Sequence, residues 1–404
     1  WKASDAMSER AKFILEWERR WRAQEGRVDV AELCRGAGVS RQTGYVWIRR
    51  YQEAGHDLRA LEERSRRPQT NPRATAPAVE DLIVATRKLY PKWGPQKLRR
   101  ILVDRHPQVP MPGATTLAAI LRRRGMAAIR RPRPRVRRSA VVATPFPDCT
   151  APNDVWCMDF KGWFRTGDRE KCYPFTLLDG LSRLLLRCEA LVEPTSAAVR
   201  GILDSAFREY GLPKRLRSDG GPPFFAAPAP ATLSTVSVWV LRLGIELECI
   251  APASPQQNGR LERFHRTLKR EVDIAPTVTA QQRLFDGYRG QYNAERPHAA
   301  LALATPASVY RCAARRYPRP LLTTAHNFHA ERVDRRGTIR WHRRRLFIGE
   351  PLAFEYVELW PAEGHRWDVY FGAIHIGAID ATQQRFLPLR RTKGPMRFSY
   401  VGSA

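Results

Sequence analysis

Residues 155–192 read VWCMDFKGWFRTGDREKCYPFTLLDGLSRLLLRCEALV, and this stretch decides the fold of the middle of the chain. Apolar, aromatic and β-branched residues dominate three runs, VWCMDFKGWF, YPFTLLDG and SRLLLRCEALV, and this composition predicts three strands. The DG and SR dipeptides between the last two runs indicate a tight turn, so we expect these strands to pair antiparallel.

Helices and strands alternate after this stretch. We expect helices over 195–211 and around 237–244, strands over 214–219 and 245–252, and a long helix opened by SPQQNGRLERFHRTLKRE at 254–271. Three antiparallel strands followed by alternating helix and strand predict an α/β layer fold of the ribonuclease-H kind.

The segment RVDVAELCRGAGVSRQTGYVWIRRYQEAG, which starts at position 27, has the pattern of a helix-turn-helix. Val30, Leu33 and Cys34 have helical spacing, Gly36 and Gly38 are expected to break that helix, and Ser40 is placed to cap a second one. We expect the second helix to bury Tyr45, Ile48 and Tyr51 and to present Arg41, Gln42, Thr43 and Trp47 to the major groove of DNA. The alternative is a helix–glycine–helix pattern in a protein that never contacts DNA.

A second helical block spans VEDLIVATRKLYPKWGPQKLRRILVDR and GATTLAAILRRRGM, and it resembles another helix-turn-helix. RRPRPRVRR follows at 130–138, where two prolines forbid a helix. It is either a solvated linker or a linker that also follows a DNA backbone through its arginines, among them Arg130, Arg131, Arg133 and Arg135.

The last part of the chain contains strand-like runs separated by glycine turns, GTIRWHRRRLFIG, AFEYVELW and RWDVYFGAIHIGAID, which predict a small C-terminal β-barrel. The predicted architecture is therefore multidomain α+β. Its parts are helix-turn-helix modules at 1–66 and 75–128, a linker at 129–149, a ribonuclease-H-like α/β core at 150–312 and the barrel at 320–390.

The net charge of the 404-residue chain is +29, and such an excess of basic residues points to nucleic acid. The excess is +17 over residues 1–150, +3 over 151–310 and +9 over 311–404, so the middle holds acids that some function requires. No apolar run approaches a membrane span and no secretion leader follows Trp1. Seven scattered cysteines without a C-x-x-C pair argue against disulfides and zinc, and favour a reducing cytoplasm.

Three acids stand out in the central region. Asp159 interrupts an apolar strand, and Asp219 ends a strand directly before Gly220 and Gly221, where open sheets place ligand sites. Glu262 lies beside the apolar stripe of the long helix and on the same side as Lys269. We expect the glutamate to face the two aspartates along the edge of the sheet.

Three carboxylates close together repel each other by about 4 kcal/mol per pair at ~4 Å and an effective dielectric of ~20, unless a cation lies between them. Oxygen ligands alone suggest Mg²⁺ or Mn²⁺, and two such ions would serve the cleavage of a phosphodiester. The alternative is that each of the three acids is only a helix cap or a partner in a surface ion pair, such as Glu262 with Arg266. Asp179, in LLDGLSR, is expected only to form a turn.

The motifs WCMDFKG, LLDGLSR, RSDGGPPF, APASPQQNGRLERFHRTLKRE and YNAERPHAAL followed by TPASVY resemble, in this order, the catalytic core of bacterial insertion-sequence transposases related to retroviral integrases, the DDE superfamily. The resemblance covers residues 150–310 strongly and the flanking modules loosely. It implies a two-metal core that nicks transposon ends and joins their 3′ hydroxyls to target DNA. The implied acids are Asp159, Asp219 and Glu262, and the implied DNA contact is Lys269. Among the cations around Glu262, which we expect to hold the DNA, Arg266 is a further expected contact.

The chain departs from the family pattern at two places. Gly220 stands where an asparagine usually follows the second aspartate, which removes a side chain that could orient the site. The 43 positions from Asp219 to Glu262 exceed the retroviral spacing, and the excess falls in AAPAPATLSTVS, 226–237, which we expect to be a surface loop.

The leading hypothesis is a transposase of the bacterial cytoplasm, associated with the nucleoid. It would bind the inverted-repeat ends of an insertion sequence and the target DNA, as a homodimer or larger assembly, without membrane contact. The first rival is a DNA-binding regulator with an inactive core, and the second is a nuclease of the same fold that hydrolyses without joining.

Overall fold

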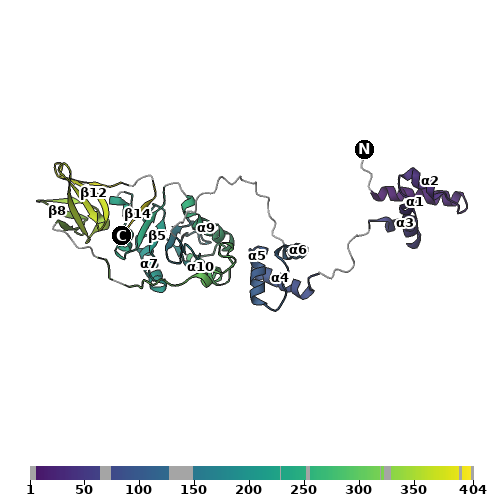
Figure 1. Ribbon diagram of the computed structural model, residues 1–404, viewed down its shortest axis with the longest axis horizontal. Coiled ribbons are helices and arrows are strands. Elements are labelled where there is room, and N and C mark those ends of the chain that lie inside the picture. The colour runs from purple at the N-terminus through teal and green to yellow at the C-terminus, as the bar shows by residue number, and fades with distance from the viewer. Residues whose placement is uncertain are drawn as a thin grey trace. The chain divides into compact units, whose positions relative to one another are not determined.

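The computed structural model describes residues 6–63, 74–126, 149–227, 229–251, 255–318, 320–322, 329–390 and 394–401 (Figure 1). The chain divides into two compact units, Trp1–Ala74 and Thr75–Ala404. The arginine-rich segment at 130–138 lies outside the described residues, so both interpretations of it stay predictions.

The first unit is helical, and its helix-turn-helix segment has the predicted break at Gly38 and the predicted cap at Ser40. Asp29 accepts hydrogen bonds from the first backbone amides of α2, Gly38 ends this helix in the left-handed conformation, and Ser40 accepts from Thr43 N at 3.2 Å to begin α3. The elements are α1 (Ala6–Ala23), α2 (Val30–Ala37), α3 (Arg41–Glu53) and the 3₁₀ turn η1 (Leu58–Leu61).

Two details of the helix-turn-helix prediction are wrong. Gly36 does not break the helix but lies inside α2. Tyr45 is 55% exposed, because Gly44, Ile48 and Tyr51 form the buried stripe of α3 instead. A Cβ on Gly44 would lie 2.4 Å from Cys34 Sγ, so the two helices approach more closely than any side chain at this position allows.

The second unit begins with three helices, α4 (Pro77–Leu89), α5 (Pro95–Arg105) and α6 (Ala114–Arg123). Their predicted apolar faces are buried together with Tyr90 and Trp93, whose rings stack at 4.0 Å. We call residues 74–126 the helical module. It is joined to the following domain by a hydrogen bond from the Tyr90 hydroxyl to Glu295 and by Lys92, whose Nζ lies 3.1 Å from Asp273 Oδ1.

A mixed sheet forms the core of this unit. In the described residues its strands run in the order β14-β6-β5-β1-β3-β2, with β4 also paired to β3. β1, β3 and β4 are antiparallel as predicted, whereas β5 and β6 lie parallel to β1. The bounds are β1 (Val155–Phe160), β2 (Phe164–Arg165), β3 (Lys171–Asp179), β4 (Leu185–Leu191), β5 (Arg215–Ser218), β6 (Glu246–Cys249) and β14 (Met396–Phe398).

Helices cover both faces of the core sheet, as the alternation of its side chains requires. Trp156 and Met158 of β1 belong to the apolar cluster that contains α7 (Ser196–Tyr210) and α8 (Thr235–Arg242). Val155 and Cys157 belong to the opposite cluster, with α9 (Gly259–Glu271) and α10 (Val278–Ala294). The short elements nearby are η3 (Pro255–Asn258), η4 (Ala299–Leu301) and α11 (Pro306–Val309).

The segment 226–237 is not the surface loop that its composition suggested. It contains η2 (Pro230–Thr232) and the start of α8, and Ala231 and Leu233 are almost fully buried. Ala231 N donates to Leu389 O at 3.0 Å, so the segment binds the C-terminal strands to the core. Its small and apolar residues are therefore packing residues.

The C-terminal strands form an open sheet, so the predicted closed barrel is not found in the described residues. Five strands run in the order β13-β12-β11-β10-β7, and β8 and β9 make a separate hairpin. Their bounds are β7 (Ala330–Arg332), β8 (Thr338–Trp341), β9 (Arg344–Phe347), the turn η5 (Glu350–Leu352), β10 (Tyr356–Ala362), β11 (Arg366–Phe371), β12 (Ile374–Asp380) and β13 (Arg385–Pro388). Among the described helices, none is long and apolar enough to cross a membrane.

Candidate active site

Two of the predicted acids lie at the ends of neighbouring parallel strands. β1 and β5 are in register at Cys157 and Arg217, and Asp159 and Asp219 each follow two positions later. Because side chains alternate between the faces of a sheet, both aspartates belong to the face covered by α9 and α10. The structure thus brings these two carboxylates together.

The environment of Asp159 opposes its ionisation. Burial and, after it, repulsion from the carboxylate of Asp219 raise the pKa of Asp159 to about 7. The amide of Gly221 lies 3.4 Å from Oδ1 of Asp219, so the backbone after Gly220 supplies a weak polar contact where the expected asparagine side chain is missing. Two adjacent carboxylates that repel each other are a suitable binding site for a cation.

His265 of α9 is a buried residue of the site that the sequence analysis missed. Its Nε2 lies 2.8 Å from Thr176 Oγ1, and the Thr176 hydroxyl donates to the carbonyl oxygen of Asp159 at 3.1 Å. Burial and, after it, the positive charge of Lys161 lower the pKa of His265 to about 3, so the imidazole is neutral.

The hydrogen bonds assign the tautomer of this imidazole. Since the Thr176 hydroxyl uses its proton on the carbonyl of Asp159, its oxygen accepts from Nε2–H of His265. Nδ1 of His265 therefore carries a lone pair, and it lies 3.9 Å from Oδ2 of Asp159. A histidine three residues after Glu262, next to the apolar stripe of the helix, was the signal that could have revealed this contact.

Glu262 stands in the first turn of α9, and its side chain is exposed. It is one helical turn before His265, and residues at this spacing have Cβ atoms about 5–6 Å apart, so Glu262 lies on the same side of α9 as His265. In the part of the chain that the structure describes, no three acidic, histidine or cysteine side chains are grouped to hold a metal ion. The described ion pairs also do not join Glu262 to Arg266.

The donor set fits a hard divalent cation. Asp159 and Asp219 offer carboxylate oxygens, which Mg²⁺ and Mn²⁺ prefer, and a cation between them would relieve the repulsion that raises the pKa of Asp159. The exposed side chain of Glu262 is not grouped with the two aspartates in the described residues, so its predicted place in the site stays a prediction. Nδ1 of His265 carries a lone pair and lies 3.9 Å from Oδ2 of Asp159, so it could serve as a further ligand of a cation held by Asp159.

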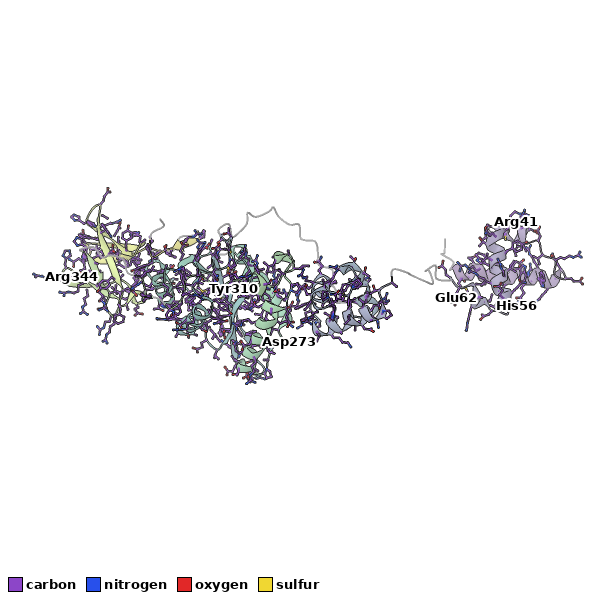
Figure 2. The ribbon with its side chains drawn as sticks, turned by 60° about the horizontal axis from the view of Figure 1, so that its bottom comes forward. Arg41, His56, Glu62, Asp273, Tyr310 and Arg344 are labelled. Atoms are coloured by element: carbon purple, nitrogen blue, oxygen red, sulfur yellow. The ribbon has the colours of Figure 1, made fainter. Side chains whose placement is uncertain are left out.

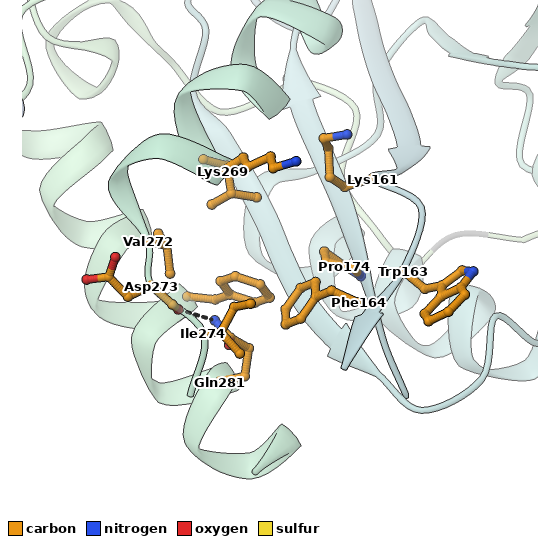
Figure 3. Close-up of a pocket in the computed structure, with 11 residues that line it drawn as sticks. Lys161, Trp163, Phe164, Pro174, Lys269, Val272, Asp273, Ile274 and Gln281 are labelled. Carbon is orange, nitrogen blue, oxygen red and sulfur yellow. Dashed lines mark hydrogen bonds between the residues drawn. The ribbon is translucent and has the colours of Figure 1, made fainter. Parts of the chain in front are cut away.

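A pocket of about 240 Å³ lies between the end of α9, α10 and residues of β2, β3 and the segment after β1, and the three acids do not line it. Lys269 points across it toward Lys161, which follows β1, and Trp163 and Phe164 line the same side as Lys161 (Figure 3). Lys161 is close enough to act electrostatically on both Asp159 and His265. Lys269 therefore lines this pocket, and its predicted contact with DNA stays a prediction.

The residues predicted to contact DNA in the first unit lie at the start of α3. Arg41, labelled in Figure 2, and Gln42 are exposed. The Thr43 hydroxyl lies 2.8 Å from that of Ser40 in the helix cap, whereas the ring of Trp47 packs edge-on against Phe13. Arg266 of α9 is exposed, and Arg130, Arg131, Arg133 and Arg135 lie outside the described residues.

Asp179 lies away from the acids of the site and has the structural role that its motif indicated. Its carboxylate is buried and accepts hydrogen bonds from the amides of Asn153 and Ser182, both at 2.8 Å, and from the Ser182 hydroxyl. These bonds stabilise the turn between β3 and β4.

Comparisons with known proteins agree with this geometry. Residues 150–255 and 243–306 each match a family described as Integrase core domain, and residues 43–121 match one described as Homeodomain-like domain. The chain is 30% identical over 165 residues to the Insertion element IS407 uncharacterized 31.7 kDa protein of Burkholderia multivorans, which covers 39% of this chain and 54% of that protein. It is 31% identical over 160 residues to the Insertion element IS476 uncharacterized 39.2 kDa protein of Xanthomonas euvesicatoria, which covers 39% and 44%. The chain thus spans about half the length of the curated relatives it matches.

Solved structures show only a distant likeness. The HTLV-2 integrase catalytic core domain in complex with magnesium aligns with a TM-score of 0.30 and 13% identity, over 40% of this chain and 99% of that one. The simian T-cell lymphotropic virus intasome aligns with a TM-score of 0.36 and 15% identity, over 78% and 98%. At these TM-scores the likeness adds nothing to the sequence matches.

The central region, residues 150–306, is therefore an integrase core domain. The integrase core matches and the likeness to proteins of insertion elements support a relationship to bacterial insertion-sequence transposases of the DDE/integrase family.

Proposed function

We propose that this protein is an active DNA transposase. It binds the inverted-repeat ends of an insertion sequence, nicks them to free 3′ hydroxyls and joins these hydroxyls to target DNA. The observation that carries the proposal is the juxtaposition of Asp159 and Asp219, with the pKa of Asp159 raised to about 7 by burial and by its neighbour. A structural role does not require two repelling carboxylates at the ends of neighbouring strands. Metal-dependent phosphoryl transfer requires such carboxylates to bind the metal ions.

In this proposal Asp159, Asp219 and Glu262 hold Mg²⁺ or Mn²⁺, as two ions. When bound, such ions supply an activated attacking oxygen and stabilise the leaving oxygen of the phosphodiester. Asp159 and Asp219 fix the position of the reacting phosphate from the sheet, and Glu262 approaches it from α9. Lys269 and Arg266 contact the DNA backbone on either side of that position.

The remaining modules recognise DNA. Arg41, Gln42 and Thr43 at the start of α3 enter the major groove, as a recognition helix does. Arg130, Arg131, Arg133 and Arg135 follow the backbone between the modules. Because two DNA ends must be joined in one event, the working form is a homodimer or a larger homo-oligomer, and we place it with the bacterial nucleoid.

The test is incubation of the full chain with labelled DNA from either side of its gene, with Mg²⁺, with Mn²⁺ or with chelator. We expect metal-dependent nicking and joined products, and their loss in Asp159→Asn and Glu262→Gln variants that still bind DNA. Nicked products without joined ones would favour a nuclease of the same fold. Tight binding without cleavage under every metal would replace the transposase by a DNA-binding regulator with an inactive core.

A further inference from the structure

A basic cleft lies where the helical module meets the integrase core. Its volume is about 700 Å³, and it is separate from the pocket that Lys269 lines. Six of its lining residues are lysines or arginines and none is acidic: Arg87, Lys92, Lys97, Arg122, Arg270 and Arg296. A cavity lined by one sign of charge attracts the opposite sign.

Part of this charge is already neutralised. Arg270 and Arg296 both pair with Glu271, at 2.7 and 2.8 Å, and Lys92 pairs with Asp273 at 3.1 Å. The cations that remain available to bind a ligand are thus the other three of the helical module, Arg87, Lys97 and Arg122.

Arg87, Lys97 and Arg122 have no ion-pair partner among the described residues. Arg87 is only 7% exposed, and its Nη1 donates to the carbonyl oxygens of Pro91 and Trp93. Its Nε has no hydrogen-bond partner among the described residues, although leaving a buried donor unpaired is costly. Arg87 thus adds a buried positive charge to the wall of the cleft.

Lys97 is partly buried in the cleft among other charged side chains. Burial and, after it, the positive charge of Arg296 lower the pKa of Lys97 to about 7, although the negative charge of Glu271 opposes this shift. α5, which carries Lys97, begins at Pro95 without a side-chain cap, and its first turn lines the cleft. The partial positive charge of a helix N-terminus adds to that of the side chains.

We infer that this cleft binds a backbone phosphate of DNA through Lys97 and Arg122, with the charge of the buried Arg87 behind them. The inference rests on the proposed function for its ligand, since a strand that is held by the helical module and is cut in the core has to cross the junction of the two. The bound phosphate would neutralise the cleft and fix the module against the core, to which Tyr90 and Lys92 already connect it.

The first experiment measures DNA binding in chelator, so that cleavage plays no part. The affinity of the full chain for a random-sequence duplex is determined as a function of salt, for the protein and for a Lys97→Gln/Arg122→Gln double variant. Each lost phosphate contact makes the slope of log affinity against log salt shallower by about 0.9, so we expect a slope shallower by about one to two. An unchanged slope would overturn the inference.

A matched control is the Lys88→Gln/Arg100→Gln variant, which removes the same charge from the helical module outside the cleft. Its slope is expected to stay within experimental error of that of the parent protein. A control slope that is reduced as much as that of the cleft variant would show that general charge, and not the cleft, sets the affinity.

The second experiment uses the unmodified protein and therefore does not depend on the folding of a variant. Lysines are trace-acetylated near neutral pH, and modified sites are quantified by mass spectrometry. We expect Lys97 to react readily in the free protein and to be protected several-fold by the duplex, while Lys88 is not protected. Inorganic phosphate at the same phosphate concentration is expected to protect much less.

The outcomes separate this inference from the proposed function. Protection of Lys97 by DNA together with an absence of metal-dependent cleavage would sustain the cleft and reject the transposase. Metal-dependent cleavage without protection of Lys97 would sustain the transposase and reject the cleft as a phosphate site. Equal protection by DNA and by inorganic phosphate would reject the DNA backbone as the ligand.

Discussion

Nδ1 of His265 lies 3.9 Å from Oδ2 of Asp159, and this relationship connects the helix that carries Glu262 to the strand that carries the first aspartate. Thr176 completes the connection, because it binds both the imidazole and the carbonyl of Asp159. The neutral imidazole thus fixes the position of α9 relative to the sheet. Its Nδ1, which carries a lone pair, lies near the carboxylate of Asp159.

Replacing His265 by alanine is expected to lower metal-dependent cleavage by about 10- to 100-fold, the usual effect of removing a residue that orients a metal ligand. The half-saturating Mn²⁺ concentration is expected to rise with it, because Asp159 loses its positioning partner. The Thr176→Ser variant keeps the hydroxyl and serves as the control. A His265→Ala protein that only melts earlier, with its metal requirement unchanged, would assign the histidine a purely structural role.

Cation binding is expected to weaken at acidic pH. The pKa of Asp159 is raised to about 7 in the folded protein, so the carboxyl group keeps its proton below this pH. A divalent cation binds the carboxylate only, and the half-saturating concentration is therefore expected to rise up to about tenfold for each pH unit below 7. Calorimetry with Mn²⁺ at about pH 6 and about pH 8 measures this, with Asp159→Asn as a control that loses the pH dependence. Equal affinities at the two pH values would contradict it.

The ion pair of Glu271 and Arg296 is buried on both sides, with side chains 5% and 7% exposed. Replacing Glu271 by glutamine leaves the guanidinium without a counter-charge and is expected to lower the free energy of unfolding by about 3–5 kcal/mol. Asp104→Asn, which breaks the exposed pair with Arg100, is expected to cost less than about 1 kcal/mol. Urea denaturation at neutral pH compares the two, and equal losses would argue against this role of Glu271.

The same pair predicts a pH dependence of stability. Burial opposes the ionisation of Glu271, but hydrogen bonds from Arg296 and Arg270 outweigh burial and hold its pKa below the usual value. A lowered pKa in the folded state gives stability that is complete above the ordinary glutamate pKa and is lost as the pH falls through the folded-state value. The parent protein is expected to lose stability over this acidic range more steeply than Glu271→Gln does, as acid denaturation monitored by circular dichroism would show.

Gly44 is expected to be irreplaceable in the first unit. A Cβ at this position would lie 2.4 Å from Cys34 Sγ and 3.0 Å from Phe13, so Gly44→Ala is expected to destabilise the unit by about 1–3 kcal/mol. Gly36→Ala is the matched control, because nothing lies within 4 Å of its added Cβ and alanine favours the helix. Thermal unfolding of both variants, together with DNA binding, tests this difference; a Gly44→Ala protein as stable as Gly36→Ala would refute the close approach.

The strand pattern and the two aspartates could be predicted because alternation and strand ends depend on local sequence alone. His265 could not, since its role depends on Thr176, which lies on a different strand and is distant in the sequence. Tyr45 was misplaced for a similar reason: the close approach of Gly44 to Cys34 belongs to the packing of two helices and not to the spacing within one.

The two errors in the rest of the fold have one physical cause. Segment 226–237 has the small residues and prolines of a loop, but Ala231 and Leu233 in it are buried, next to C-terminal strands that the local pattern cannot place. Those same strands were expected to close on themselves, whereas they pack against the core instead. Contacts between distant parts of the chain thus decided both outcomes.

The pairing of β14 with β6 affects when the core can be completed. Met396–Phe398 hydrogen-bonds to Leu247–Cys249 at the edge of the sheet, next to the strand that leads to Asp219. During synthesis on the ribosome this edge stays open until nearly all of the described chain has emerged, and an open edge invites pairing with other polypeptides. The last of the described strands therefore closes the sheet that carries the acids, so a nascent chain lacks the finished core until Met396–Phe398 has been translated.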